Sequence, residues 1–207
     1  MDNEAVYAQG LLRRALDPST QPPSIRAFLT DELELVRILL RPRSRVLDFG
    51  CGMGRHLIAL SSHLGPSVGF DYEVAYIREA RQASAGAGCV FFVADATAVP
   101  LSAPFDAAIC LTNTWGTMSD KLGVINEMCR LSPAAGTRLV TVYSPGSVAA
   151  RREWYANMGH RVVAATDCEL ISEGGFSSEH FTEGRLRGLI GPCQLHPIGN
   201  IAYLAQF

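Results

Sequence analysis

An aspartate followed by alternating glycines carries the strongest chemical signal in this sequence. Asp48 ends a short apolar run, and Gly50, Gly52 and Gly54 follow it at every second position. Glycines let a backbone turn sharply and approach a ligand closely, and a helix that begins behind them exposes unpaired N–H groups. A carboxylate beside such a loop repels a pyrophosphate and suits a ligand that carries an ammonium or another cation.

Two common glycine-rich loops are excluded by the spacing. The dinucleotide fingerprint G-x-G-x-x-G requires a third glycine at the position where Arg55 stands. A P-loop requires a Gly-Lys-Ser/Thr sequence, and none follows. The loop therefore predicts a small ligand with a cationic group rather than a nucleotide held by its phosphates.

Two further aspartates stand where the same ligand would extend. Asp71 ends the next apolar run, about one strand–helix–strand step after Asp48, where a carboxylate accepts hydrogen bonds from ribose hydroxyls. Asp95 ends the following run and could accept a bond from the exocyclic amine of adenine. Tyr72 could lie against the base.

The elements that must position these residues alternate between strands and helices. Strands are expected at 45–49, 67–71, 89–95, 105–112 and 137–144, and helices at 54–64, 73–84 and near 119–131. This alternation indicates an α/β fold, with a mostly parallel sheet, helices on both faces, and the strand C-terminal ends along one edge.

The flanks depart from this alternation. Helices are expected at 3–16 and 24–40 before the first strand. Beyond the fifth strand we expect a helix at 146–159, two short strands within 161–173 that turn near Thr166 and Asp167, a helix at 181–191, and a closing strand pair at 193–198 and 201–207.

Three segments together resemble the class I S-adenosylmethionine-dependent methyltransferases. They are VLDFGCGMG (46–54), GFDYEVAYIREAR (69–81) and VADATAVPLSAPFDAAICLTNTWGTM (93–118), and the resemblance covers about residues 45–144. It implies a seven-stranded sheet whose last strand is antiparallel, and S-adenosylmethionine as the cofactor. The cofactor-binding residues that we expect are Asp48, Gly50, Cys51, Gly52, Asp71, Tyr72, Asp95, Ala96, Leu111 and Asn113.

The resemblance assigns these residues to parts of the cofactor. Asp48 and the glycine loop would line its methionine moiety, Asp71 would hold the ribose, and Asp95 and Ala96 would border the adenine. Residues 111–113, after the fourth strand, would flank the methyl-bearing sulfur.

One domain is expected to span residues 1–207. Within it, we expect an N-terminal helical cap at 1–42, a cofactor-binding core at 43–144, a substrate-cap insertion at 145–181 and a closing helix and strands at 182–207. Tyr7 could close over the cofactor as a lid residue.

Two residues are candidates for catalysis of methyl transfer. His180 follows flexible glycines and has a side chain that titrates near neutral pH, so it could act as a general base. Tyr143 ends the fifth strand and could hydrogen-bond the acceptor. A surface or capping histidine and a packed tyrosine are the alternatives. Trp115 could form an apolar wall of the acceptor pocket or belong to the core.

The composition narrows the partners. The 207 residues include 48% apolar and 18% charged residues with a formal net charge of −2, so no basic footprint for nucleic acid is expected. No signal peptide or membrane span is evident. The six scattered cysteines form no C-x-x-C pair, so we expect no metal site and a cytoplasmic protein. A monomer or homodimer is expected.

The leading hypothesis is methyl transfer to oxygen, nitrogen or carbon of a small molecule. The alternatives are a protein or RNA methyltransferase and a non-catalytic S-adenosylmethionine-binding module. An Asn/Asp-Pro-Pro-Tyr motif, which is typical of enzymes that methylate amino groups of nucleic acids, is absent after the fourth strand, where the sequence is LTNTW.

Overall fold

A single seven-stranded sheet organises the computed structural model, which describes Asn3, Tyr7 and residues 10–207. The strand order is β3-β2-β1-β4-β5-β10-β9. Neighbouring strands from β3 to β5 pair in parallel, whereas β10 is antiparallel to both β5 and β9. The strands are β1 (Val46–Phe49), β2 (Ser67–Asp71), β3 (Cys89–Val93), β4 (Ala107–Cys110), β5 (Thr137–Tyr143), β9 (Gln194–Ile198) and β10 (Ala202–Gln206). The predicted sheet with an antiparallel last strand is confirmed.

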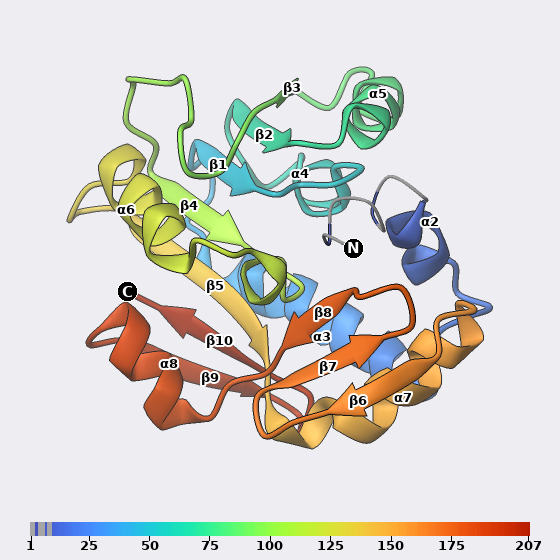
Figure 1. The fold of residues 1–207 in the computed structure, drawn as a ribbon. Coiled ribbons are helices and arrows are strands. Elements are labelled where there is room, and N and C mark those ends of the chain that lie inside the picture. Colours follow the sequence, from blue (N-terminus) through green and yellow to red (C-terminus); the bar gives the residue numbers. More distant parts are fainter. Residues whose placement is uncertain (1–2, 4–6, 8–9) are drawn as a thin grey trace.

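Helices cover both faces of this sheet (Figure 1). Alternate residues of a strand point to opposite faces, so Val46 and Leu47 of β1 belong to two separate apolar cores. The first core packs against α3 (Pro23–Leu39), α4 (Arg55–Ala59), α5 (Val74–Ala83) and α7 (Val148–Asn157). The second packs against α6 (Lys121–Leu131) and α8 (Glu183–Ile190). The central strands are therefore buried on both sides, as their continuous apolar runs indicate.

The helix expected at 3–16 is interrupted. Gly10 has φ of +81°, in the left-handed region, and α2 begins after it and spans Leu11–Leu16. Glycine adopts this conformation without the steric cost that other residues bear, so it suits the position directly before α2. The remainder of the expected helix, apart from Asn3 and Tyr7, lies outside the described residues.

A smaller antiparallel sheet lies between α7 and α8 in the chain. It consists of β6 (Val162–Ala165), β7 (Glu169–Ser172) and β8 (Ser177–Glu179), in that spatial order. The sequence predicts the first two strands, and their turn lies where expected. The sequence did not predict the short polar strand β8. This strand contacts the 3₁₀ turn η1 (Trp115–Thr117), which follows β4.

Candidate active site

A cavity of about 630 Å³ opens at the C-terminal ends of the parallel strands. This edge is where ligands bind in open α/β sheets. Its walls come from the loops after β1, β2, β3 and β4, from the N-terminal segment and from the region of β8. Nine of the ten predicted cofactor residues line it: Asp48, Gly50, Cys51, Gly52, Asp71, Tyr72, Asp95, Ala96 and Leu111.

The glycine loop takes its shape from left-handed backbone conformations and from Asp71. Gly50, Gly52 and Gly54 have φ of +68°, +54° and +82°. The Asp71 carboxylate accepts hydrogen bonds from the Gly52 amide and the Glu73 amide, both at 2.9 Å. Asp71 therefore fixes the loop after β1 as well as facing the cavity, a structural task that the sequence did not reveal.

Asp48 places a buried carboxyl group at the cavity wall. Its side chain is 1% exposed, and its Oδ2 atom has no hydrogen-bond donor among the described residues. Burial raises its pKa to about 8, against the opposing charge of Arg55, because an ionised carboxylate is costly to desolvate. A buried acceptor at the wall of a cavity suits a ligand ammonium, which would stabilise the ionised form.

A second carboxylate beside the cavity is fully bonded. Glu32, on α3, is 0% exposed and accepts hydrogen bonds from the Thr112 amide at 2.6 Å and the Thr112 hydroxyl at 2.7 Å. The Arg55 guanidinium lies 2.6 Å from the same carboxylate and His56 Nε2 lies 3.2 Å from it. Burial alone would raise the pKa of Glu32, but His56, Arg55 and Thr112 lower it to about 2.

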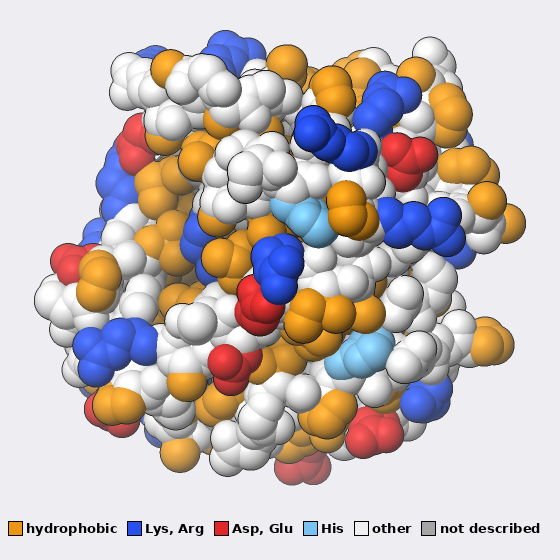
Figure 2. Space-filling view, turned by 180° about the vertical axis from the view of Figure 1, so that it is seen from behind, with side chains coloured by type: hydrophobic (Ala, Val, Ile, Leu, Met, Phe, Trp, Pro, Cys, Tyr) orange, Lys and Arg blue, Asp and Glu red, His pale blue; other side chains and the backbone are white. Residues whose placement is uncertain are grey.

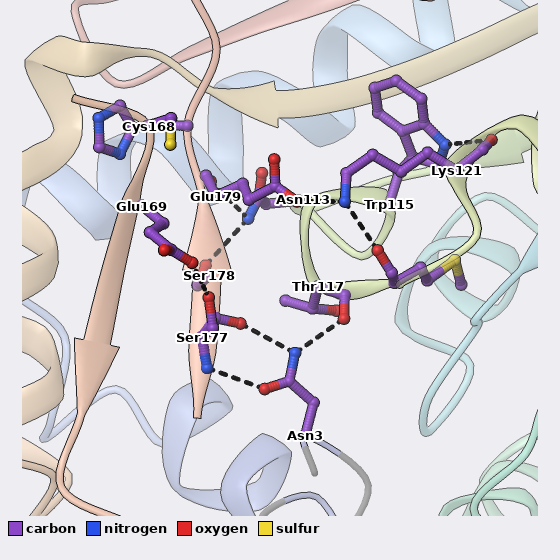
Figure 3. Close-up of polar contacts among 12 residues, drawn as sticks. Asn3, Asn113, Trp115, Thr117, Lys121, Cys168, Glu169, Ser177, Ser178 and Glu179 are labelled. Carbon is purple, nitrogen blue, oxygen red and sulfur yellow. Dashed lines mark hydrogen bonds and ion pairs between the residues drawn. The ribbon is translucent and has the colours of Figure 1, made fainter. Parts of the chain in front are cut away.

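Asn3 and Tyr7, the two described residues before Gly10, line the cavity. The Asn3 side-chain amide donates to the carbonyl oxygens of Thr117 and Ser177 at 2.7 and 2.9 Å, and it accepts from the Ser177 amide (Figure 3). The Tyr76 hydroxyl donates to the Tyr7 carbonyl oxygen at 2.6 Å, and Tyr7 itself lines the cavity. These contacts join α5, on the side of the predicted ribose and adenine residues, to β8.

The acidic residue on the β8 side is neutralised. Glu179 lines the cavity and forms ion pairs with both Lys121 and Arg185. Figure 3 shows Lys121 reaching from the start of α6 toward Glu179 on β8. Among the residues that the structure describes, this wall therefore presents no unpaired carboxylate to a ligand.

The structure does not bring either predicted catalytic residue to the cavity wall. His180 is 3% exposed, and burial together with the nearby charge of Arg151 lowers its pKa. Tyr143 is buried against Phe28, and the Arg151 guanidinium lies 4.4 Å from the centre of its ring. Their catalytic roles have no geometric support, so we do not include them in the proposed site.

Asn113 and Trp115 also lie behind the wall. The Asn113 side chain donates to Ser178 Oγ at 3.0 Å and accepts from the Tyr143 amide at 2.9 Å, so it ties the loop after β4 to β5 and β8. Trp115 is fully buried and stacks on Phe181. Trp115 therefore belongs to the core, the alternative that the sequence left open, and Asn113 holds segments next to the cavity together without lining it.

Sequence reasoning missed Glu32 and the cavity position of Arg55. A signal for Glu32 existed, because it falls four residues after Phe28 and four before Val36, on the apolar stripe of its own helix. A carboxylate on a buried stripe requires a partner and is a candidate for a structural or functional role. No group of metal-ligating residues is found in the described part of the chain.

Comparisons with known proteins agree with this geometry. Residues 46–136 match a family model described as a methyltransferase domain. The fold is shared with the PH0226 protein of Pyrococcus horikoshii (18% identity, TM-score 0.73, 92% of this chain and 95% of that one). It is also shared with a magnesium protoporphyrin IX methyltransferase of Synechocystis, solved with bound S-adenosylmethionine (14% identity, TM-score 0.66, 100% of this chain and 96% of that one). A third structure with this fold is the CcbJ methyltransferase of Streptomyces caelestis (14% identity, TM-score 0.64, 92% of each chain).

The fold and the matched domain define the class of protein. Residues 46–136 carry a methyltransferase domain, and the chain has the fold of methyltransferases that use S-adenosylmethionine. A search of curated proteins finds no match. The unpaired Asp48 carboxyl group and the open glycine loop fit the ammonium and the methionine chain of that cofactor.

Proposed function

We propose that this protein transfers the methyl group of S-adenosylmethionine to a small molecule. The observation that supports the acceptor class is the cover of the cavity, by which we mean Asn3 and Tyr7 together with Ser177 of β8, to which Asn3 is bonded. A cavity of about 630 Å³ falls in the range of sites that enclose drug-sized ligands. A covered cavity of this size suits a small acceptor better than a folded RNA or protein surface.

The cofactor supplies a methyl group that is already activated on a sulfonium. The residues of the chain bind, orient and exclude water. We assign the ammonium to Asp48, the ribose to Asp71 and the adenine to the segment 95–97, and we expect Tyr72 to contact the base. The walls farther from these residues, which include Tyr7, Thr117 and Ser177, remain for the acceptor. They carry hydroxyl groups, which favours a polar acceptor, and they lie beside Asp120, a cavity residue whose carboxylate accepts a hydrogen bond from the Gly123 amide.

The charge distribution also favours a small acceptor over a nucleic acid. On the face opposite to the view of Figure 1, acidic and basic side chains are interspersed among apolar and uncharged ones (Figure 2). RNA recognition requires a basic surface, and the net charge of −2 supplies no excess. Within the described residues, no helix has the length and apolar character needed to cross a membrane.

The experiment that tests this proposal uses S-adenosylmethionine labelled in the methyl group. The protein is incubated with the label and a cell extract, which is then separated into small molecules, protein and RNA. We expect label in a small molecule other than S-adenosylmethionine itself, and none there above background with the Asp48→Asn variant. Label in the protein or RNA fraction would contradict the proposed acceptor class. Absence of binding to S-adenosylmethionine would contradict the cofactor site itself.

Two predictions from the sequence remain proposals. We expect a cytoplasmic location, which cell fractionation would test. We also expect a monomer or homodimer, which light scattering of the purified chain would distinguish from larger assemblies.

A further inference from the structure

The turn after β4 has an unfavourable backbone conformation. Thr112 and Asn113 have φ of +53° and +60°, in the left-handed region. Asparagine enters this region more readily than most residues, whereas a β-branched threonine there is a genuine outlier. Such a conformation persists only when the surrounding structure enforces it, and it often marks a functional site.

Glu32 is the group that enforces this conformation. One carboxylate oxygen accepts a hydrogen bond from the Thr112 amide at 2.6 Å, and the other accepts one from the Thr112 hydroxyl at 2.7 Å. The carboxylate therefore binds both the backbone and the side chain of Thr112. Both bonds are charge-assisted and partly buried, and such bonds are stronger than neutral ones. The Asn113 amide in turn donates to the Thr141 carbonyl oxygen at 3.0 Å, which holds the next residue to β5.

The same carboxylate reaches the loop after β1 through Arg55. Arg55 directly follows Gly54 at the start of α4, and its terminal nitrogen lies 2.6 Å from Glu32 and 2.9 Å from the Thr112 hydroxyl. Its other nitrogen donates to the Leu29 carbonyl oxygen on α3 at 3.2 Å. One helix, α3, thus fastens the loop that carries the cofactor-binding glycines and the turn after β4.

Both fastened segments line the cavity while Glu32 does not. Arg55, His56, Leu111 and Thr112 are wall residues, and Glu32 lies behind them. Because Glu32 is paired with Arg55 and bonded to Thr112, it has no charge to offer to a ligand. Its effect on the site must therefore pass through the position of the two loops.

We propose that Glu32 is a positioning residue that holds the turn at Thr112 and the loop ending at Arg55 in register around the methyl-donor end of the cofactor. This inference depends on the proposed function. Glu32 does not bind the cofactor. It fixes the backbone that surrounds the cofactor, and misplacement of such a wall by about 1 Å is enough to impair a reaction strongly.

The test follows the ¹³C-labelled methyl group of S-adenosylmethionine by NMR, together with cofactor affinity by calorimetry. In Glu32→Gln, an isosteric change, we expect the bound methyl resonance to move at least halfway back to its free position, or to broaden, while affinity changes by less than about threefold. Glu34→Gln is the matched control, because Glu34 is an exposed carboxylate on the same helix that pairs only with Arg37. We expect that control to retain the wild-type spectrum.

Variants of Thr112 test the same contact independently, and they can be used even if the Glu32→Gln variant does not fold. Thr112→Ser keeps the hydroxyl and should retain the wild-type methyl resonance. Thr112→Val keeps the shape, loses the hydroxyl and should shift the resonance as Glu32→Gln does. In the ligand-free protein, the Thr112 amide should exchange its hydrogen at least tenfold faster in Glu32→Gln than in the wild type.

The outcomes separate this inference from the function on which it depends. If the wild type binds S-adenosylmethionine and the Glu32→Gln and Thr112→Val variants both leave the methyl resonance unchanged, the positioning role is wrong and the proposed function stands. A lower thermal stability with a wild-type methyl resonance would have the same meaning, since it would show a merely structural role. If the wild type does not bind the cofactor at all, the proposed function fails and this inference fails with it.

Discussion

Two buried carboxylates beside the same cavity have opposite environments. Asp48 has an oxygen without a donor, and burial raises its pKa to about 8. Glu32 is just as buried, but hydrogen bonds from His56 and Thr112 and the charge of Arg55 outweigh the burial and lower its pKa to about 2. The first is an acceptor available to a cationic ligand, and the second is committed to the protein's own loops.

The contrast shows that, beside one cavity, one carboxyl group is available to bind the ligand and another holds the loops that form the wall. A buried carboxylate without a partner destabilises the ligand-free chain and gains most when a cation arrives. A buried carboxylate with every donor in place gains nothing from a ligand and instead fixes the walls. The contrast predicts that changes at Asp48 alter affinity, whereas changes at Glu32 alter geometry.

The largest effect is expected from Asp48→Asn. Removing the charge from a buried site that pairs with a ligand ammonium costs about 2–5 kcal/mol, so affinity for S-adenosylhomocysteine should fall about 30-fold or more. Isothermal titration calorimetry measures this affinity. Asp31→Asn, an exposed carboxylate on α3 away from the cavity, is the control and should bind as the wild type does. Equal affinities in the two variants would remove Asp48 from the site.

A smaller loss of affinity is expected from Asp71→Ala. We expect about 1–3 kcal/mol, from lost charge-assisted bonds to the ribose and from loosening of the loop at Gly52, whose amide Asp71 holds. Asp71→Asn, which keeps one acceptor oxygen, should lose less. Calorimetric titration of both variants would show unchanged affinity if the ribose lies elsewhere.

The same contrast predicts opposite effects of pH on stability. For Asp48, the pKa is about 8 in the folded chain against an ordinary 3.8, so ionisation costs stability progressively as the pH rises from about 4 to 8. Ligand-free Asp48→Asn should gain about 1–3 kcal/mol over the wild type at pH 8 and little at pH 4. For Glu32, stability is present above pH 4.5 and is lost as the pH falls toward 2. Urea unfolding at several pH values checks both directions.

The smallest effect is expected at the cover of the cavity. Asn3→Ala removes bonds to Thr117 and Ser177 that are only partly buried, so dissociation of S-adenosylhomocysteine should accelerate about two- to tenfold. Asn157→Ala is the control, because Asn157 also donates its amide to a distant backbone, at Thr20, but lies outside the cavity. Stopped-flow displacement would show identical rates in both variants if the segment is not a cover.

The sequence was informative wherever the signal was local. The sheet and eight of the expected cavity residues follow from runs of apolar residues that end in Asp48, Asp71 or Asp95, because strand, loop and acid are contiguous in the chain. Leu111, just past β4, was expected from the resemblance to the class I methyltransferases, and it also lines the cavity.

The rest of the site depends on contacts between distant segments. Glu32 meets Thr112 eighty positions away, and Asn3 meets Ser177 across an even longer separation. His180 illustrates the limit, because alternation along the extended chain sends its neighbour Glu179 to the cavity and leaves His180 buried elsewhere. Nothing in the residues around His180 distinguishes the two orientations.

The central claim is that the unpaired Asp48 carboxyl group receives the cofactor's ammonium, and proton release on binding tests it most directly. At pH 6.5, we would titrate the chain with S-adenosylhomocysteine by calorimetry in two buffers of different ionisation enthalpy. Because the pKa of Asp48 is about 8 in the ligand-free chain, the account predicts micromolar binding with release of close to one proton. Absence of binding, or binding without proton release, would contradict it.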